Sequence, residues 1–183
     1  MTSARPNPPG PDPRPDSPVP TLRPFRAEDL EAALALNAES APHVARLDAG
    51  ELLAYAESAT VALVATIHEA VTAYLVAFAW DAPCDGEEFQ AARLWLDHFL
   101  HIDQVAVAGS ARGRGIGSAL YDALVPGCRA RGVTALTCGV NLDPPNPGSL
   151  RFHTRLGFAE IGRVTTRDGN LVALLRKDLT GDR

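Results

Sequence analysis

The stretch from Ile102 to Leu120 constrains the fold of this chain more than any other, because three glycines at every second position separate two segments of opposite character. Residues 102–107, before the glycines, are rich in β-branched side chains, which suit a half-buried strand. From residue 116 to residue 128 an apolar side chain recurs at every fourth position, which predicts one apolar face of a helix. The sequence therefore predicts a strand, a glycine-rich turn and a helix in direct succession.

This turn has the composition of an anion-binding site. Glycines allow the backbone to approach a ligand closely, and the first turn of a helix presents unpaired N–H groups at the positive end of its dipole. The ligand that suits such a turn best is a phosphate or a pyrophosphate. The alternative, a connection that binds nothing, fits two arginines among three glycines less well. The residues predicted to bind the anion are Arg112, Gly113, Arg114, Gly115, Ile116, Gly117 and Ser118.

Two common phosphate-binding patterns are absent from the turn. A P-loop requires Gly-Lys followed by Ser or Thr, whereas Gly117 and Ser118 follow one another with no lysine before them. A dinucleotide-binding turn requires G-x-G-x-x-G, and the glycines at 113, 115 and 117 have a different spacing. The sequence therefore gives no support to other classes of nucleotide-binding enzyme.

Composition favours one globular domain in a reducing compartment. The chain has 183 residues, of which 46% are hydrophobic and 21% charged. Its formal net charge of -5 gives no electrostatic support to nucleic-acid binding, and no apolar run reaches the length of a membrane span. The three cysteines, at 84, 128 and 138, have no C-x-x-C spacing, which argues against disulfides and against a metal site. We expect free thiols, no bound metal and a cytoplasmic location.

The chain divides into a tail and a domain. Residues 1–20 contain eight prolines and almost nothing apolar, so they cannot bury enough surface to fold, and we expect a disordered tail. Residues 21–183 form the domain. Its expected strands cover 21–26, 60–67, 71–80, 100–107, 133–140, 158–165 and 170–176, and its expected helices start near 27, 50, 91, 116 and 147. Pro126 should kink or interrupt the fourth helix. This order predicts a mixed α/β (α+β) fold around one mostly antiparallel sheet flanked by helices.

The glycine turn resembles that of a known superfamily. Arg112, Gly115 and Gly117 form R-x-x-G-x-G directly after a strand, which resembles the acyl-CoA pyrophosphate loop of the GNAT superfamily of N-acetyltransferases. A second segment, N-x-x-S-x-x-x-H-x-x-L-G-F from Asn146 to Phe158, resembles the second GNAT signature. The residues N-L-D-P-P-N-P-G-S at 141–149, which overlap the start of this segment, resemble a bacterial subset of the superfamily. The resemblance covers about residues 21 to 177.

The resemblance implies acetyl-CoA as co-substrate, and it assigns roles to several residues. Backbone groups of the strand before the loop would contact the acyl carbonyl, and an asparagine of the second signature would contact the cofactor. In this sequence these residues are Val105, Ala106, Val107 and Asn146. His153 stands where the family has the tyrosine that protonates the leaving thiolate. Imidazolium, with a reference pKa of about 6.5, can also donate such a proton, although an ordinary helical histidine is the alternative.

The base that accepts the amine proton is less clearly marked. Asp103 is the candidate, as base or as anchor for the amine, and the alternative is a structural ion-pair partner. Two-residue alternation predicts that His101 and Asp103 share a strand face with Val105 and Val107. The candidate residues for lining the acceptor site are Trp80, His101 and Asn141.

These observations lead to an acetyl-CoA-dependent N-acetyltransferase that transfers the acetyl group directly to an amine, carried by a small molecule or a peptide. The alternative from another class is a GNAT module that binds acyl-CoA as a sensor without turnover. The histidine at position 153 and the unsettled base keep that alternative open. Dimers are frequent in the superfamily, so a homodimer is compatible with the resemblance. The acceptor is left open.

Overall fold

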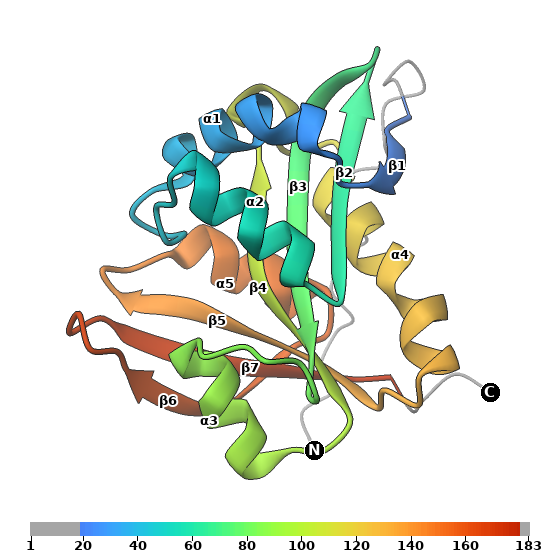
Figure 1. Cartoon of the computed structure of the whole chain (residues 1–183). Helices are drawn as coiled ribbons and strands as arrows, with labels where there is room; N and C mark the ends of the chain where they lie inside the picture. Colours follow the sequence, from blue (N-terminus) through green and yellow to red (C-terminus); the bar gives the residue numbers. More distant parts are fainter. Residues whose placement is uncertain (1–18, 180–183) are drawn as a thin grey trace, which may run out of the picture.

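The computed structural model describes residues 19–179 and builds them around one seven-stranded sheet (Figure 1). The strand order is β1-β2-β3-β4-β5-β7-β6, and every neighbouring pair is antiparallel except β4 and β5. This arrangement confirms the predicted mixed, mostly antiparallel sheet. The strands are β1 (Thr21–Pro24), β2 (Val61–Ile67), β3 (Ala70–Ala79), β4 (Phe99–Val107), β5 (Ala135–Asp143), β6 (Ala159–Thr165) and β7 (Leu171–Asp178).

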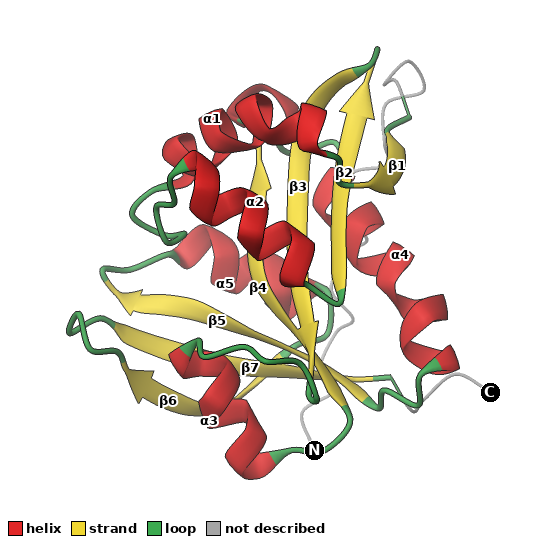
Figure 2. Ribbon diagram, in the orientation of Figure 1, coloured by secondary structure: helices red, strands yellow, loops and turns green. Residues whose placement is uncertain are grey.

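Helices cover both faces of the sheet (Figure 2). On one face α1, α2 and α3 pack over a core that includes Leu52, Tyr74 and Phe89, and on the other face α4 and α5 pack over a core that includes Ile102 and Leu120. The helices are α1 (Leu30–Ser40), α2 (Ala49–Ser58), α3 (Glu87–Trp95), α4 (Ile116–Ala130) and α5 (Pro147–Arg155), with short 3₁₀ turns η1 (Ala27–Asp29) and η2 (Gly109–Ala111).

Local signals account for several element boundaries. The β2–β3 hairpin turns at His68 and Glu69, both with positive φ, as two-residue hairpin turns require. The Asn146 side chain accepts a hydrogen bond from the backbone N–H of Ser149 at 3.1 Å, and Pro147 occupies the first helical position. The start of α5 near residue 147 was predicted from the sequence.

The expected bounds of one helix and the expected interruption of another were wrong. The third helix was expected over 91–99 but runs from Glu87 to Trp95, because β4 takes the apolar residues from Phe99 onward into the sheet. The fourth helix runs unbroken through Pro126. Proline removes the hydrogen bond to the carbonyl of Asp122, but both residues are exposed, so water can satisfy that carbonyl.

The predicted alternation along β4 breaks at Asp103. The ladder pairs Ala77 with Ile102 and Val76 with Gln104, so Asp103 is an extra, bulged residue. The bulge reverses the faces beyond it. His101 therefore packs toward α3, whereas Val105 and Val107 pack with the core under α4, and the expected common face of these residues is wrong.

The described part of the chain begins two residues before β1, close to the predicted start of the domain. The predicted proline-rich tail lies, except for its last two residues, outside the described residues. Among residues 19–179, no helix is long and apolar enough to cross a membrane.

Candidate functional site

The centre of the candidate site is a fork between the two parallel strands. β4 and β5 pair only from Phe99–Ala135 to Ile102–Cys138 and then diverge, as Figure 1 shows. The fork consists of residues 103–107 of β4 and residues 139–143 of β5. Beyond the last pair, β4 is bonded only to β3, so its other edge is open to a ligand.

The glycine turn lies at the end of the β4 arm. Gly113 and Gly115 have φ of +75° and +78°, a conformation that side chains rarely adopt. Gly115 is the residue before α4, and no side chain among residues 19–179 caps the helix. The first bond of the helix runs from the N–H of Ala119 to the carbonyl of Gly115 at 2.9 Å. The N–H groups of the first turn therefore have no partner within the helix, which is the arrangement that suits an anion. That they bind one stays a prediction.

The third glycine has a packing role. A Cβ on Gly117 would lie 3.0 Å from the ring of Phe152, so the absence of a side chain lets the start of α4 approach α5 closely. Arg112 and Arg114 are both exposed beside the turn. The Arg112 side chain donates through Nε to the carbonyl of Val107 at 3.2 Å, which leaves the other guanidinium donors available to an anion.

Asp103 lies at the root of the fork, against residues from α2 and from the segment before α3. A Cβ on Gly86 would lie 3.3 Å from its carboxylate, and the hydroxyl of Tyr55 is near enough to act on the pKa of that carboxylate. Glu88 lies across the fork root, since a Cβ on Gly139 of β5 would be 3.0 Å from Glu88 Cγ. Two carboxylates therefore flank the point where the strands separate.

Burial governs the protonation of this pair. It raises the pKa of Asp103 to about 6, a shift that the nearby Tyr55 hydroxyl opposes and the nearby carboxylates of Glu88 and Asp85 increase. Burial also raises the pKa of Glu88 above its ordinary value. A carboxylate with a pKa of about 6 is ionised at neutral pH yet basic enough to take a proton from a bound ammonium group.

His153 is buried, with an exposed fraction of 2%, and both of its ring nitrogens have partners. Nδ1 lies 2.9 Å from the carbonyl oxygen of Ser149, and Nε2 lies 2.7 Å from the hydroxyl of Tyr121 on α4. Burial lowers the pKa of the imidazole, against a smaller opposite effect of the bond to Ser149. The ring therefore reaches the rest of the site through Tyr121.

The remaining predicted residues divide between the two arms and the core. Asn141 lies on the β5 arm, and its carbonyl accepts a bond from the N–H of Asn146 at 3.0 Å. The side-chain oxygen of Asn146 caps α5, which leaves its amide nitrogen as the group available to a cofactor. A contact between Asn146 and the cofactor stays a prediction.

Trp80 and His101 do not join the fork. Trp80 donates its backbone N–H to the carbonyl of Phe99, at the end of β4 where the strands are still paired. His101 is 2% exposed and lies 2.9 Å from Thr137 Oγ1 on β5. Burial lowers the pKa of His101 to about 3, so it is a neutral residue of the sheet core. That either side chain lines the acceptor site stays a prediction.

The sequence model of the Acetyltransferase (GNAT) family matches residues 6–158. The chain belongs to this family. The match confirms the predicted family, whereas the roles of the two motifs and the bacterial subset stay predictions. No curated protein matches the sequence.

Solved structures show the same GNAT fold. Ard1 from Thermoplasma volcanium matches with a TM-score of 0.72 and 19% identity over 88% of this chain and 99% of that chain. The structure of yncA from Salmonella typhimurium with its cofactor acetyl-CoA matches with a TM-score of 0.67 and 19% identity, over 90% of this chain and 96% of that chain. Ribosomal-protein-alanine N-acetyltransferase from Brucella melitensis matches with a TM-score of 0.66 and 24% identity, over 86% of this chain and 99% of that chain.

Three residues of this GNAT site were missed from the sequence: Tyr55, Glu88 and Tyr121. No motif marks them, because each reaches the site through the packing of a helix on the sheet. Within residues 19–179, no cluster of three or more His, Cys, Asp and Glu side chains could hold a metal ion.

Proposed function

We propose that this protein is an acetyl-CoA-dependent N-acetyltransferase that transfers the acetyl group directly to an amine. The single observation that carries the proposal is the fork, with a glycine turn at the end of one arm and the carboxylate of Asp103 at its root. This arrangement offers an anion site, an open strand edge and a base within one continuous element, β4 with its following loop.

The donor would be held by the β4 arm. The helix N-terminus at Gly115, assisted by Arg112 and Arg114, suits the pyrophosphate of CoA. The unpaired edge of residues 105–107 suits the amide-rich chain that leads to the thioester, because strand edges recognise such groups by main-chain hydrogen bonds. These roles are the ones expected of Val105, Ala106 and Val107.

The acceptor would be a cationic amine drawn to the two carboxylates at the fork root. Asp103 accepts a proton from the ammonium group, which leaves a neutral nitrogen able to attack the acyl carbon. Glu88, above Gly139, adds negative charge that favours binding of the cation. The proton that the leaving sulfur requires would come from the side of His153, across the fork root from Asp103.

The test is acetyl-CoA turnover, followed by release of free thiol, against a panel of amines. Asp103→Asn removes the base and should lower kcat by about 10² to 10⁴-fold. The matched control is Asp97→Asn, an exposed aspartate in the turn before β4 that should leave turnover unchanged. Turnover that survives Asp103→Asn excludes this base. Tight CoA binding without turnover on any amine would instead support the acyl-CoA sensor.

A further inference from the structure

Two polar side chains from different helices meet inside the apolar core beneath α4 and α5. The hydroxyl of Tyr121 lies 2.7 Å from Nε2 of His153, and each residue has an exposed fraction of 2%. Aromatic rings surround the imidazole, with the centroids of Phe152 and Phe158 at 5.0 and 5.3 Å. A buried polar contact in such surroundings is a specific arrangement, because leaving either partner unsatisfied would be costly.

The direction of the hydrogen bonds follows from the partners. A carbonyl oxygen only accepts, so the 2.9 Å contact between Nδ1 of His153 and the carbonyl of Ser149 places a proton on Nδ1. In the neutral imidazole Nε2 is then an acceptor, and the Tyr121 hydroxyl donates to it. In the protonated imidazole Nε2 becomes a donor, and the hydroxyl of Tyr121 is free to donate elsewhere.

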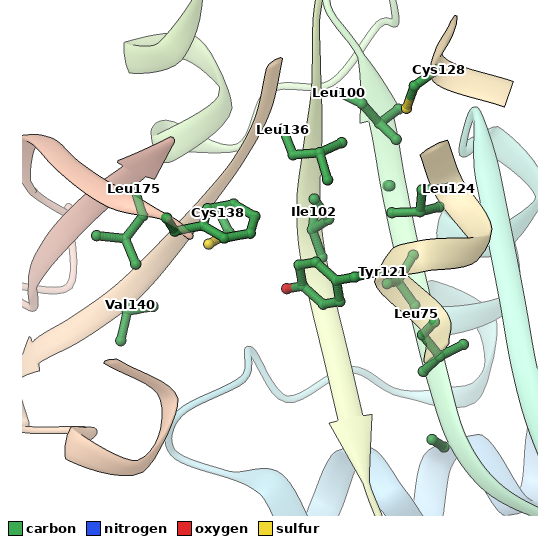
Figure 3. Close-up of a cluster of buried hydrophobic side chains, with 14 of the residues drawn as sticks. Leu75, Leu100, Ile102, Tyr121, Leu124, Cys128, Leu136, Cys138, Val140 and Leu175 are labelled. Carbon is green, nitrogen blue, oxygen red and sulfur yellow. The ribbon is translucent and has the colours of Figure 1, made fainter. Parts of the chain in front are cut away.

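The Tyr121 hydroxyl faces the point where β4 and β5 separate. Figure 3 shows the phenol of Tyr121 extending from α4 across β4 toward β5, with Ile102 and Cys138 beside it. Ile102 and Cys138 form the last parallel pair before β4 and β5 separate. The phenol oxygen therefore lies at the root of the fork, and His153 reaches the fork only through it.

We infer that Tyr121 and His153 form a proton relay that protonates the CoA sulfur, an inference that rests on the proposed acetyltransferase function. As the bond from the acyl carbon to sulfur breaks, its electron pair goes to the sulfur, which takes the hydroxyl proton of Tyr121. The phenol oxygen takes the Nε2 proton of His153, so that the phenol is restored and the imidazole becomes neutral. Asp103 releases to solvent the proton that it took from the ammonium group, and the acylated nitrogen releases its second proton to solvent as the amide forms. Solvent returns one proton to His153 before the next turnover, so each turnover releases one proton in total.

Neither residue performs this step alone. Burial raises the pKa of Tyr121 well above its ordinary value, so the phenol does not release its proton unless another is supplied. His153 supplies one only in its imidazolium form, which burial disfavours by lowering its pKa. Its Nδ1 is bonded to Ser149 and its Nε2 is covered by Tyr121, so that proton leaves through the phenol. The phenol thus donates directly to the sulfur, and the imidazole replaces the proton that the phenol gives up.

The test is a double-mutant cycle on purified protein with acetyl-CoA and an amine on which the wild type turns over. Tyr121→Phe and His153→Phe should each lower kcat by about 10²-fold while the KM for acetyl-CoA changes by less than about threefold. The double variant should be no slower than the slower single variant, because both changes remove one proton path. The matched control is Tyr74→Phe, a buried tyrosine whose hydroxyl bonds to Gln104 in the other core, and it should keep wild-type kcat.

Two results would overturn the relay alone: wild-type kcat in Tyr121→Phe, or losses in the double variant that multiply. His153→Gln provides an independent check if Tyr121→Phe does not fold, since glutamine can donate a bond to the phenol but has no transferable proton. It should be as slow as His153→Phe, and wild-type kcat in His153→Gln would also overturn the relay. Absence of turnover in the wild type on every amine would overturn the proposed function, and the relay with it.

Discussion

Ile102 of β4 and Cys138 of β5 are the last residues that the two parallel strands pair, and the next residue of β4, Asp103, is bulged out of the ladder with β3. The strand therefore changes its relation to both neighbours at one point. A bulge re-aims the side chain at its position. The carboxylate of Asp103 consequently faces α2 and α3, at the place where the sheet opens.

The position of Asp103 has a cost in stability that can be measured. Its pKa rises from 3.8 to about 6 because of burial, so folding favours its protonated form. That contribution is fully present below pH 3.8 and is lost as pH rises through 6. Asp103→Asn should therefore raise the free energy of unfolding by about 1–3 kcal/mol at pH 8. Urea denaturation at about pH 8 and about pH 3.5 checks this, and an equal gain at both values would contradict it.

Tyr55 limits the rise in the pKa of the Asp103 carboxylate. Burial raises the pKa of Asp103, and the nearby hydroxyl of Tyr55 opposes the rise. In Tyr55→Phe the pKa of Asp103 should rise further, so the fall of kcat/KM on the acid side should move to higher pH. A pH–rate profile from about 5 to about 9 measures this. The rate at the alkaline end should match the wild type, and a uniform loss across the range would point to a packing effect instead.

The sequence predicted those parts of the site that depend on neighbouring residues. The cap at Asn146 and the turn at Gly115 are decided within about four positions of the chain, so their residue types indicate them. The strand and helix around the turn follow from short periodic patterns of the same kind.

The parts that were missed depend on contacts between distant segments. The bulge at Asp103 is a property of the pairing between β3 and β4, and no local pattern in β4 marks it. The bond between Tyr121 and His153 joins residues 32 positions apart on two helices, each with an apolar face that suggests only packing. Periodicity identifies the buried face of a helix but not which polar groups meet there.

Gly115, at the start of α4, and Gly127, inside the same helix, should respond in opposite ways to substitution by alanine. Gly115 has φ of +78°, so Gly115→Ala should lower the free energy of unfolding by about 1–2 kcal/mol and weaken CoA binding. Gly127 lies inside α4 without positive φ, and a Cβ there would meet nothing within 4 Å. Gly127→Ala should instead raise stability by about 0.5–1 kcal/mol. Thermal melting and CoA titration calorimetry distinguish the two, and equal losses would contradict the assignment.

The ion pair between Arg23 and Asp29 should matter more for stability than any exposed pair in the described chain. Nη2 and Nη1 of Arg23 lie 2.6 and 2.7 Å from the two carboxylate oxygens of Asp29, which also accepts from the N–H of Arg26 at 2.8 Å. Asp29 is 3% exposed. The bond from Arg23 lowers the pKa of Asp29 despite its burial, so this stability is lost as pH falls below the ordinary value of 3.8.

Asp29→Ala should therefore lower the free energy of unfolding at pH 7 by about 2–4 kcal/mol, because it leaves three donors without an acceptor at the junction of β1 and α1. The control is Glu28→Ala, which removes an ion pair with Arg26 whose side chains are 61% and 68% exposed. Water screens such a pair, so its loss should be about 0–1 kcal/mol. Denaturant titration of both variants distinguishes the two cases: similar losses would mean that burial of Asp29 cancels the strength of its bonds.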